Sequence, residues 1–431
     1  MSLYGALYTG VAGLAANSRA MANTSTNIAN VNTVGYKSTR NEFSTLLSTT
    51  AVGNYAGGVK NISMPQISSQ GNILQTSSST DLAISGQGFF AVTPTPVSNP
   101  SINEVNYTRA GAFQKDASGF LRNSAGYYLQ GWALDANGKI PTNANNLSLI
   151  NLGQVNGTAL PTSTAILRAN LKSTADITPS YVPGDLAAGT VAPQYETSIE
   201  FFDSQGSSRP LRLAFVKSAA NTWEYEAIYD GDPNDIGGAA NNPVASGTMT
   251  FNTDGTLATP SGNVAITVPF AASSGLAPQS IDFNFGTAGK ADGFTQFDTT
   301  STLYGSDING TLYGGLSGVR VDESGFVIAL FTNGIETPLY KLPLATFTNP
   351  DGLGPLNGDA YRQSVESGPP SLKSAAESGA GKISNQAVEQ STVDIAKEFS
   401  DMIVIQRAYS AASKIITTAD EMLNELTSMK R

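Results

Sequence analysis

The side chains that carry most enzyme chemistry are missing from this chain. Its 431 residues include no histidine and no cysteine. A Ser-His-Asp or Cys-His nucleophile, an imidazole general base and a zinc site with histidine or thiolate ligands therefore cannot be built. Only carboxylate, lysine and tyrosine groups remain, and the missing cysteines exclude disulfide bonds as well.

Two patterns resemble ligand sites but lack essential parts. Four segments place Asp at the start and Gly at the end of four residues: Asp116–Gly119, Asp135–Gly138, Asp203–Gly206 and Asp322–Gly325. Because none has the spaced ligands and closing Glu of a calcium-binding loop, we interpret them as hairpin turns. Gly86-Gln-Gly88 lacks the third glycine and the following helix of a dinucleotide-binding motif, so it is interpreted as a strand turn. No metal or other cofactor is expected.

Two alternatives to a structural protein stay open. A secreted glycan hydrolase would need a pair of carboxylates, and no spacing of Asp and Glu in the sequence singles out such a pair. A β-rich surface adhesin would need exposed aromatic side chains. Trp223 lies in an alternating strand pattern and is interpreted as a core residue instead.

Charge and hydropathy exclude further classes of protein. Only 13% of the residues are charged and the formal net charge is −10, which argues against a nucleic-acid groove lined by Lys and Arg. So few charges are unusual for a freely soluble monomer, so we expect much of the surface to be interface. No apolar run reaches the roughly 18 to 20 residues of a membrane-spanning helix. The first charge is Arg19, so no basic start of a cleaved secretory signal is evident.

The two ends of the chain have the period of helices. At the N-terminus, large apolar residues recur every seven positions and predict a helix to about residue 31. A second heptad pattern begins at Val388 and predicts a helix over about 385–427, roughly 65 Å long at about 1.5 Å per residue. A helix of that length needs a second helix to cover its apolar stripe, and the predicted N-terminal helix is the available partner. The predicted polymerisation interface therefore comprises Leu7, Leu14, Met21, Ile28, Ile395, Met402, Tyr409, Ile416 and Leu423.

Between the helices, short alternating runs and turn residues predict strands. We expect a multidomain fold: long N- and C-terminal α-helices form a coiled-coil-like domain, and two all-β domains follow, the distal one inserted into the proximal one. Shifts in composition predict an N-terminal helix over 1–32, connecting segments over 33–78 and 365–384, a proximal β-domain over 79–149 and 286–364, a distal β-domain over 150–285 and a C-terminal helix over 385–431.

The most specific motif follows the N-terminal helix. It runs Asn27-Ile-Ala-Asn30-Val-Asn-Thr-Val-Gly35-Tyr36-Lys37. By physical chemistry alone it is a helix stop, because Asn bonds nearby backbone and Gly35 can take a positive φ that redirects the chain. The segment also resembles the signature of the axial flagellar proteins, the family of rod, hook and hook-associated subunits.

Further segments are similar to the same family. Asp81–Phe90 and Tyr107–Phe113 resemble its next two shared segments, and Thr392–Leu423 resembles its closing helix. Thr392 stands where family members commonly have Asn, and either residue can cap a helix through its side-chain oxygen. The predicted inserted domain and the segment Leu344–Leu353 favour the hook branch over the mostly shorter rod subunits.

This resemblance implies a non-enzymatic subunit of the bacterial flagellar hook. Such subunits polymerise into a flexible, curved tube, a universal joint that transmits torque from motor and rod to the filament. The implied partners are further copies of the chain, the distal rod protein, the hook-filament junction proteins, the hook cap protein and the flagellar type III export apparatus. The implied location is the extracellular hook, reached without a cleaved signal peptide. A distal rod or hook-associated protein of the same family is the nearest alternative.

Overall fold

A computed structural model describes residues 3–50, 53–96, 105–135, 138–143 and 146–429. The chain divides into two compact units. The first comprises Met1–Val155, Gly318–Leu330 and Glu336–Arg431, and the second comprises Asn156–Ser317 and Phe331–Ile335. The predicted helices at both ends and the mostly β-sheet domains between them are confirmed. The predicted ranges 1–32 and 385–431 include residues 1, 2, 430 and 431, which lie outside the described residues.

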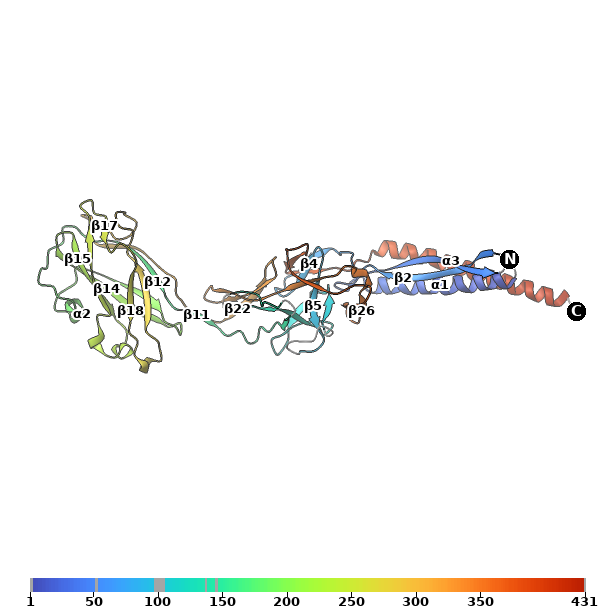
Figure 1. Ribbon diagram of the computed structural model, residues 1–431, viewed down its shortest axis with the longest axis horizontal. Helices are drawn as coiled ribbons and strands as arrows, with labels where there is room; N and C mark the ends of the chain where they lie inside the picture. Colours follow the sequence, from blue (N-terminus) through green and yellow to red (C-terminus); the bar gives the residue numbers. More distant parts are fainter. Residues whose placement is uncertain (1–2, 51–52, 97–104, 136–137, 144–145, 430–431) are drawn as a thin grey trace. The chain divides into compact units, whose positions relative to one another are not determined.

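The first unit contains both long helices. Helix α1 (Leu3–Ala29) and helix α3 (Ile395–Met429) lie side by side (Figure 1). The other side of α1 contacts an antiparallel hairpin of β1 (Thr39–Thr50) and β2 (Gly53–Pro65). A Cβ atom placed on Gly58 of β2 would lie 2.9 Å from the Cβ of Ala12, so the hairpin backbone packs directly on α1. Residues 33–78, predicted as a connecting segment, thus contain a long hairpin.

The start of the C-terminal helix differs from the prediction. Helix α3 begins at Ile395 rather than near residue 385, because the Asp394 side chain accepts hydrogen bonds from the N–H groups of residues 396 and 397 at 2.9 and 3.2 Å. Val388, predicted as part of the heptad, lies in strand β30 (Ala387–Glu389). Thr392 is not the cap, because its hydroxyl accepts from the Ser38 N–H at 2.9 Å.

The β-structure of the first unit is organised around one branched sheet. Its main path runs β22-β23-β24-β9-β5-β6-β27-β26. This sheet contains β5 (Phe89–Thr93), β6 (Asn106–Thr108), β7 (Phe113–Lys115), β8 (Leu121–Asn123), β9 (Tyr128–Ala133), β10 (Ser148–Leu149), β22 (Leu316–Val321), β23 (Phe326–Phe331), β24 (Glu336–Lys341), β25 (Pro343–Thr346), β26 (Gly354–Leu356), β27 (Ala360–Arg362) and β28 (Ser371–Ser374). Two separate two-stranded sheets pair β3 (Ile73–Gln75) with β30 and β4 (Leu82–Ser85) with β29 (Lys382–Asn385). The core of the branched sheet includes Phe89, Tyr107 and Trp132.

The second unit is a β-sandwich. A five-stranded sheet, β13-β14-β15-β16-β17, packs against a four-stranded sheet, β18-β19-β12-β20, over one apolar core. The elements are β11 (Thr158–Leu160), β12 (Thr164–Asn170), α2 (Asp185–Ala188), β13 (Tyr195–Phe202), β14 (Ser208–Ala219), β15 (Thr222–Tyr229), β16 (Ala245–Phe251), β17 (Leu257–Thr259), β18 (Val264–Val268), β19 (Gln279–Asn284), β20 (Thr302–Ile308) and β21 (Thr311–Gly314). Trp223 is fully buried in this core.

The second unit continues past the boundary predicted near residue 285. Strand β20 pairs antiparallel with β12, so residues 302–308 belong to its four-stranded sheet. Among the described helices, none is long and apolar enough to cross a membrane.

Candidate assembly surface

Helices α1 and α3 pack on each other through small side chains. A Cβ atom on Gly10 would lie 2.9 Å from Cγ1 of Ile416, and one on Gly13 would lie 3.5 Å from the Cβ of Ala412. Ala16 and Ala20 of α1 are buried as well. On α3 the buried line comprises Ile405, Ala412 and Ala419, spaced seven residues apart. Small residues allow a close approach, so this seam is filled within one chain.

The predicted polymerisation residues lie beside that seam rather than along its centre. Leu7, Leu14, Met21, Ile28, Met402, Ile416 and Leu423 are half-buried. Ile395 and Tyr409 are 46% and 41% exposed. On α3 the predicted residues Met402, Ile416 and Leu423 are thus less buried than the line of Ile405, Ala412 and Ala419.

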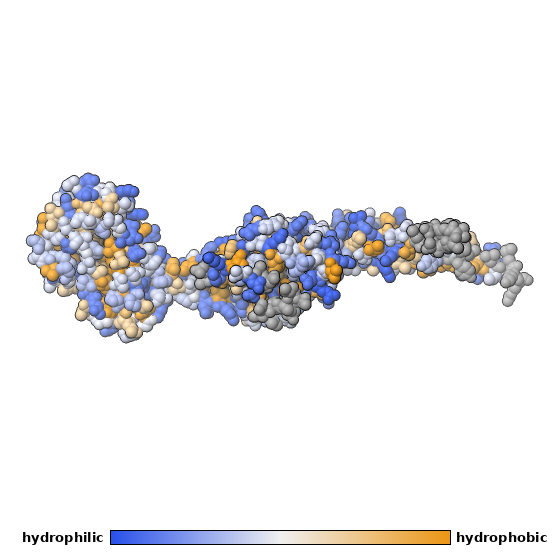
Figure 2. Space-filling model, viewed as in Figure 1, coloured by the Kyte–Doolittle hydropathy of each residue, from blue (hydrophilic) through white to orange (hydrophobic). Residues whose placement is uncertain are grey.

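Large apolar side chains remain exposed on both flanks of the seam. Val404, Ile415 and Met422 are separated by 11 and 7 residues and share one helix face, where they are 64%, 47% and 52% exposed. Ile395, Phe399 and Ile403 recur every fourth residue and share another face. In Figure 2 apolar side chains reach the surface over the region of α1 and α3. The predicted interface did not include Ile403, Val404, Ile415 and Met422, because these positions lie outside the heptad pattern.

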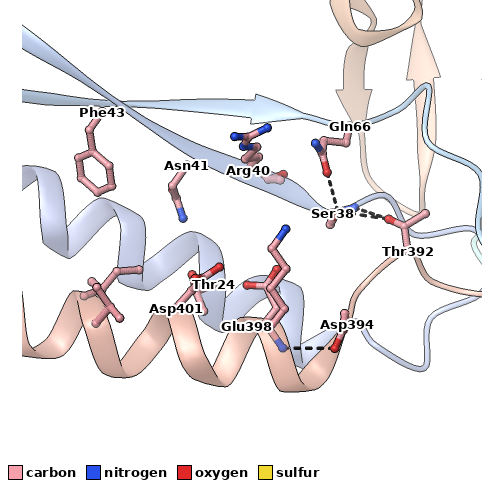
Figure 3. A pocket seen from close by; sticks show the side chains of 14 residues that line it. Thr24, Ser38, Arg40, Asn41, Phe43, Gln66, Thr392, Asp394, Glu398 and Asp401 are labelled. Carbon is pink, nitrogen blue, oxygen red and sulfur yellow. Dashed lines mark hydrogen bonds between the residues drawn. The ribbon is translucent and has the colours of Figure 1, made fainter.

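A groove opens where α3 begins beside β1 (Figure 3). Its apolar lining comprises Phe43, Val404 and Ile405, and its charged lining comprises Arg40, Asp394, Lys397, Glu398 and Asp401. Among the described residues, Arg40, Lys397 and Asp401 form no ion pair within 4 Å. The groove thus has apolar and charged groups available to a further chain.

The motif after α1 positions both helices against the hairpin. The Asn27 side chain is buried, accepts hydrogen bonds from the Thr39 N–H (3.0 Å) and the Tyr36 hydroxyl (3.1 Å), and donates to the Thr39 carbonyl (3.0 Å). It also donates to Glu398 Oε1 of α3 at 2.9 Å. Partial burial, with the neighbouring Asp401 charge, raises the pKa of Glu398. One amide therefore joins α1, the start of the hairpin and α3.

Asn30 and Gly35 have more local roles. The Asn30 amide donates to the Thr26 carbonyl at 2.9 Å, and its oxygen accepts from the Thr33 hydroxyl at 3.1 Å, closing the helix end. Gly35 has φ of 76°, and a Cβ atom there would lie 2.6 Å from the backbone nitrogen of Ala110. Gly35 is therefore required by both the backbone conformation and the close packing.

Lys37 ends in a buried charge cluster. Its ammonium lies 2.5 Å from Oε1 of Glu389, and the Arg109 guanidinium lies 3.1 Å from Oε2. The Glu389 side chain is fully buried and the two cations are nearly so. Burial lowers the pKa of both Lys37 and Arg109, and the Glu389 charge opposes that shift. Sequence reasoning identified Lys37 but missed Glu389, because a contact across 352 residues leaves no local pattern.

The described residues offer no cluster of three or more acidic side chains that could hold a metal ion. The groups brought together by the motif are paired with each other and with backbone, and they connect segments from opposite ends of the chain. Their arrangement is that of a structural junction beside a helical surface.

Family models match four parts of the chain. Residues 7–37 match the flagella basal body rod protein family, residues 83–157 the flagellar hook protein FlgE/F/G D1 domain, residues 170–311 the flagellar basal body protein FlaE D2 domain and residues 384–429 the flagellar basal body rod FlgEFG protein C-terminal family. The chain is 35% identical over 434 residues to the flagellar hook protein FlgE of Brucella melitensis, and the alignment covers both chains completely. The chain belongs to the flagellar hook protein family.

Other members of the hook protein family are similar in sequence to this chain over its full length. The FlgE proteins of Caulobacter vibrioides and Rhizobium meliloti are 32% and 35% identical, again with complete coverage of both chains. A crystal structure of Helicobacter pylori flagellar hook protein FlgE2 gives a TM-score of 0.48 at 15% identity, covering 74% of this chain and all of that one. The family assignment therefore depends on the sequence relatives. The chain is a structural subunit of the bacterial flagellar hook and serves motility.

Proposed function

We propose that the chain polymerises through the two exposed apolar flanks of α3, together with the predicted interface residues that border the seam, into a flexible curved tube. The observation that carries this proposal is the separation of small and large side chains. Small residues fill the seam between α1 and α3, whereas Val404, Ile415 and Met422 stay in water. Exposed apolar side chains spaced along one helix face are typical of an unoccupied protein interface.

The predicted polymerisation residues belong to this proposed surface. Met402, Ile416 and Leu423 are half-buried at the edge of the seam, as are Leu7, Leu14, Met21 and Ile28 on α1. A second and third helix packed on the flanks would cover their remaining exposed area. Each large apolar side chain that becomes fully buried contributes roughly 1.5 to 3 kcal/mol.

The remaining parts of the proposal concern the whole assembly. The second unit acts as an inserted distal domain, the β-sheet part of the first unit acts as the proximal domain, and the tube acts as a universal joint that passes torque from rod to filament. Its partners are other copies, the distal rod protein, the junction and cap proteins and the type III export apparatus. It functions outside the cell, is exported without a cleaved signal peptide, and catalyses no reaction.

Electron microscopy of the purified chain, concentrated in sulfate to strengthen apolar burial, tests this function. The parent should form curved tubes. Ile415→Asp should prevent tube formation because it forces a charge into the proposed interface. Thr417→Asp adds the same charge two residues later at an exposed polar position and should still form tubes. Straight rods from the parent would favour a rod protein, and tubes from Ile415→Asp would contradict the proposed surface.

A further inference from the structure

Residues 381–392 lie in a groove of the first unit as two extended runs, which meet at Gln386 with φ of 49°. Strand β29 pairs with β4 over Lys382–Asn385, and β30 pairs with β3 over Ala387–Glu389. Further backbone bonds continue the contact at both ends: the Gly381 N–H donates to the Gln87 carbonyl at 2.7 Å and the Gln390 N–H to the Asn72 carbonyl at 2.8 Å. The segment is thus paired along almost its whole length with chain that lies some 300 residues earlier.

The groove fits this segment closely. The side chains of Ile383, Ala387 and Val388 are buried. A Cβ atom on Gly71 would lie 2.1 Å from the Gln390 carbonyl oxygen, and one on Gly381 would lie 2.5 Å from the Ser85 carbonyl oxygen. Both glycines therefore permit the two backbones to approach. Close backbone pairing along a sheet edge is the geometry by which proteins bind extended peptides.

Glu389 connects this segment to the N-terminal motif. Its Oε1 accepts from Lys37 at 2.5 Å and from the Gly71 N–H at 2.7 Å, and its Oε2 accepts from Arg109 at 3.1 Å. Its backbone carbonyl accepts from the Gly35 N–H at 2.8 Å. Without Glu389, two cations would share a buried site with no counter-ion among the described side chains. Lys37 retains the Ser69 carbonyl, and Arg109 retains the Ile84 and Gly86 carbonyls.

We infer that the groove formed by residues 35–38, 69–76, 81–88 and 109 is a docking site for the chain's own residues 381–392, and that Glu389 controls it. The N-terminal motif and the β-sheet part of the first unit join stably only when this segment is in place. In a chain whose last fifty or so residues have not yet emerged during synthesis or transport, Lys37 and Arg109 lack the Glu389 counter-ion. Burying unpaired like charges is strongly unfavourable, so the two cations stay in water until Glu389 arrives. Completion of the chain thereby permits completion of the fold.

A cleavable version of the full-length protein tests this inference. A protease site is inserted between Ser378 and Gly379, in an exposed turn where a Cβ atom on Gly379 would meet nothing within 4 Å. After folding and cleavage, the fragment from residue 379 onward should stay bound. Its dissociation is measured by exchange against an excess of the same fragment carrying a fluorophore. Release during native gel filtration of the cleaved parent would overturn the inference.

Charge variants distinguish the contribution of Glu389 to fragment binding from the contribution of α3 packing, because α3 is present in every sample. Glu389→Gln should speed dissociation at least about 100-fold, because it leaves two buried cations unpaired. Glu377→Gln makes the same chemical change at an exposed position of the preceding turn and should leave the rate unchanged. Adding Lys37→Met to Glu389→Gln removes one cation and should recover at least about tenfold of the loss.

Amide hydrogen exchange on the uncleaved chain tests the same inference without the inserted protease site. Glu389→Gln should raise exchange in residues 33–38 and 71–76 together, with β13 to β16 of the second unit as the unchanged reference. Unchanged protection of residues 33–38 in Glu389→Gln would overturn the controlling role of this carboxylate, as would a dissociation rate equal to that of Glu377→Gln.

Discussion

The residues of the Asn-rich motif have two structural roles: some connect distant segments, and others end helix α1. Asn27 makes four hydrogen bonds, of which two reach Thr39 of the hairpin and one reaches Glu398 of α3. Asn30 instead bonds Thr26 and Thr33 at the helix end. The sequence alone predicted a helix stop, which is what Asn30 and Gly35 provide. It could not predict the role of Asn27, because its partner Glu398 lies 371 residues away.

Alanine substitutions at the two asparagines should therefore differ in their effect on stability. Asn27→Ala leaves buried backbone and side-chain groups unpaired and should lower the free energy of unfolding of the first unit by at least about 2 kcal/mol. Asn30→Ala should cost less than about 1 kcal/mol because its position is half-exposed. Urea unfolding followed by helical circular dichroism reports on this unit, since both long helices lie in it. Equal losses would contradict the distinction.

The Glu398 carboxylate predicts a dependence on pH. Its pKa is raised in the folded chain, so the folded state binds the proton more tightly than the unfolded state. Glu398 therefore contributes stability at acid pH, below about 4.5, that is lost as pH rises through the folded pKa. Glu398→Gln imitates the protonated form and keeps an oxygen for Asn27. It should match the parent near pH 4 and exceed its melting temperature at pH 7, and a lower melting temperature at pH 7 would contradict this.

At the scale of elements, periodicity predicted the two helices and the mostly β-sheet middle of the chain, but not the boundaries that depend on distant contacts. The heptad continued into Val388, yet tertiary pairing with β3 makes that residue part of a strand. The β1–β2 hairpin was missed because its sequence is polar and weakly alternating, and its packing on α1 becomes visible only in three dimensions. Side-chain size along α3 indicates the seam better than apolar character alone, because small residues lie where the two helices approach closely.

Enlarging one small residue of that seam should separate the helices. Ala412→Leu places a larger side chain against Gly13, and such overpacking should lower the free energy of unfolding by about 1 to 3 kcal/mol. Ala411→Leu makes the same change at the neighbouring exposed position and should cost almost nothing. Thermal unfolding followed by circular dichroism compares the two. If both variants melted with the parent, the seam assigned to Ala412 would be wrong.

At the scale of the whole molecule, the chain is built so that its ends meet. The N-terminal motif, the β-sheet part of the first unit and the C-terminal segment converge on Asn27 and Glu389, and the two terminal helices continue from that junction. The junction connects α1 and α3 through side-chain contacts, and large apolar side chains of α3 remain exposed beside it. Composition predicted a surface rich in interface, and the structure shows which apolar side chains are buried within one chain and which stay exposed.

The absence of cysteine makes the central claim directly measurable, because any introduced thiol is unique. Val404→Cys places a thiol on the proposed interface, and Arg407→Cys places one at an exposed polar position one turn away. The rate of alkylation is measured in the monomer and in sulfate-assembled tubes. We predict that assembly slows the reaction at residue 404 by at least about tenfold relative to its effect at residue 407, because a neighbouring helix covers that face. Equal protection at both positions, or full reactivity of residue 404 in intact tubes, would contradict polymerisation through the apolar flank of α3.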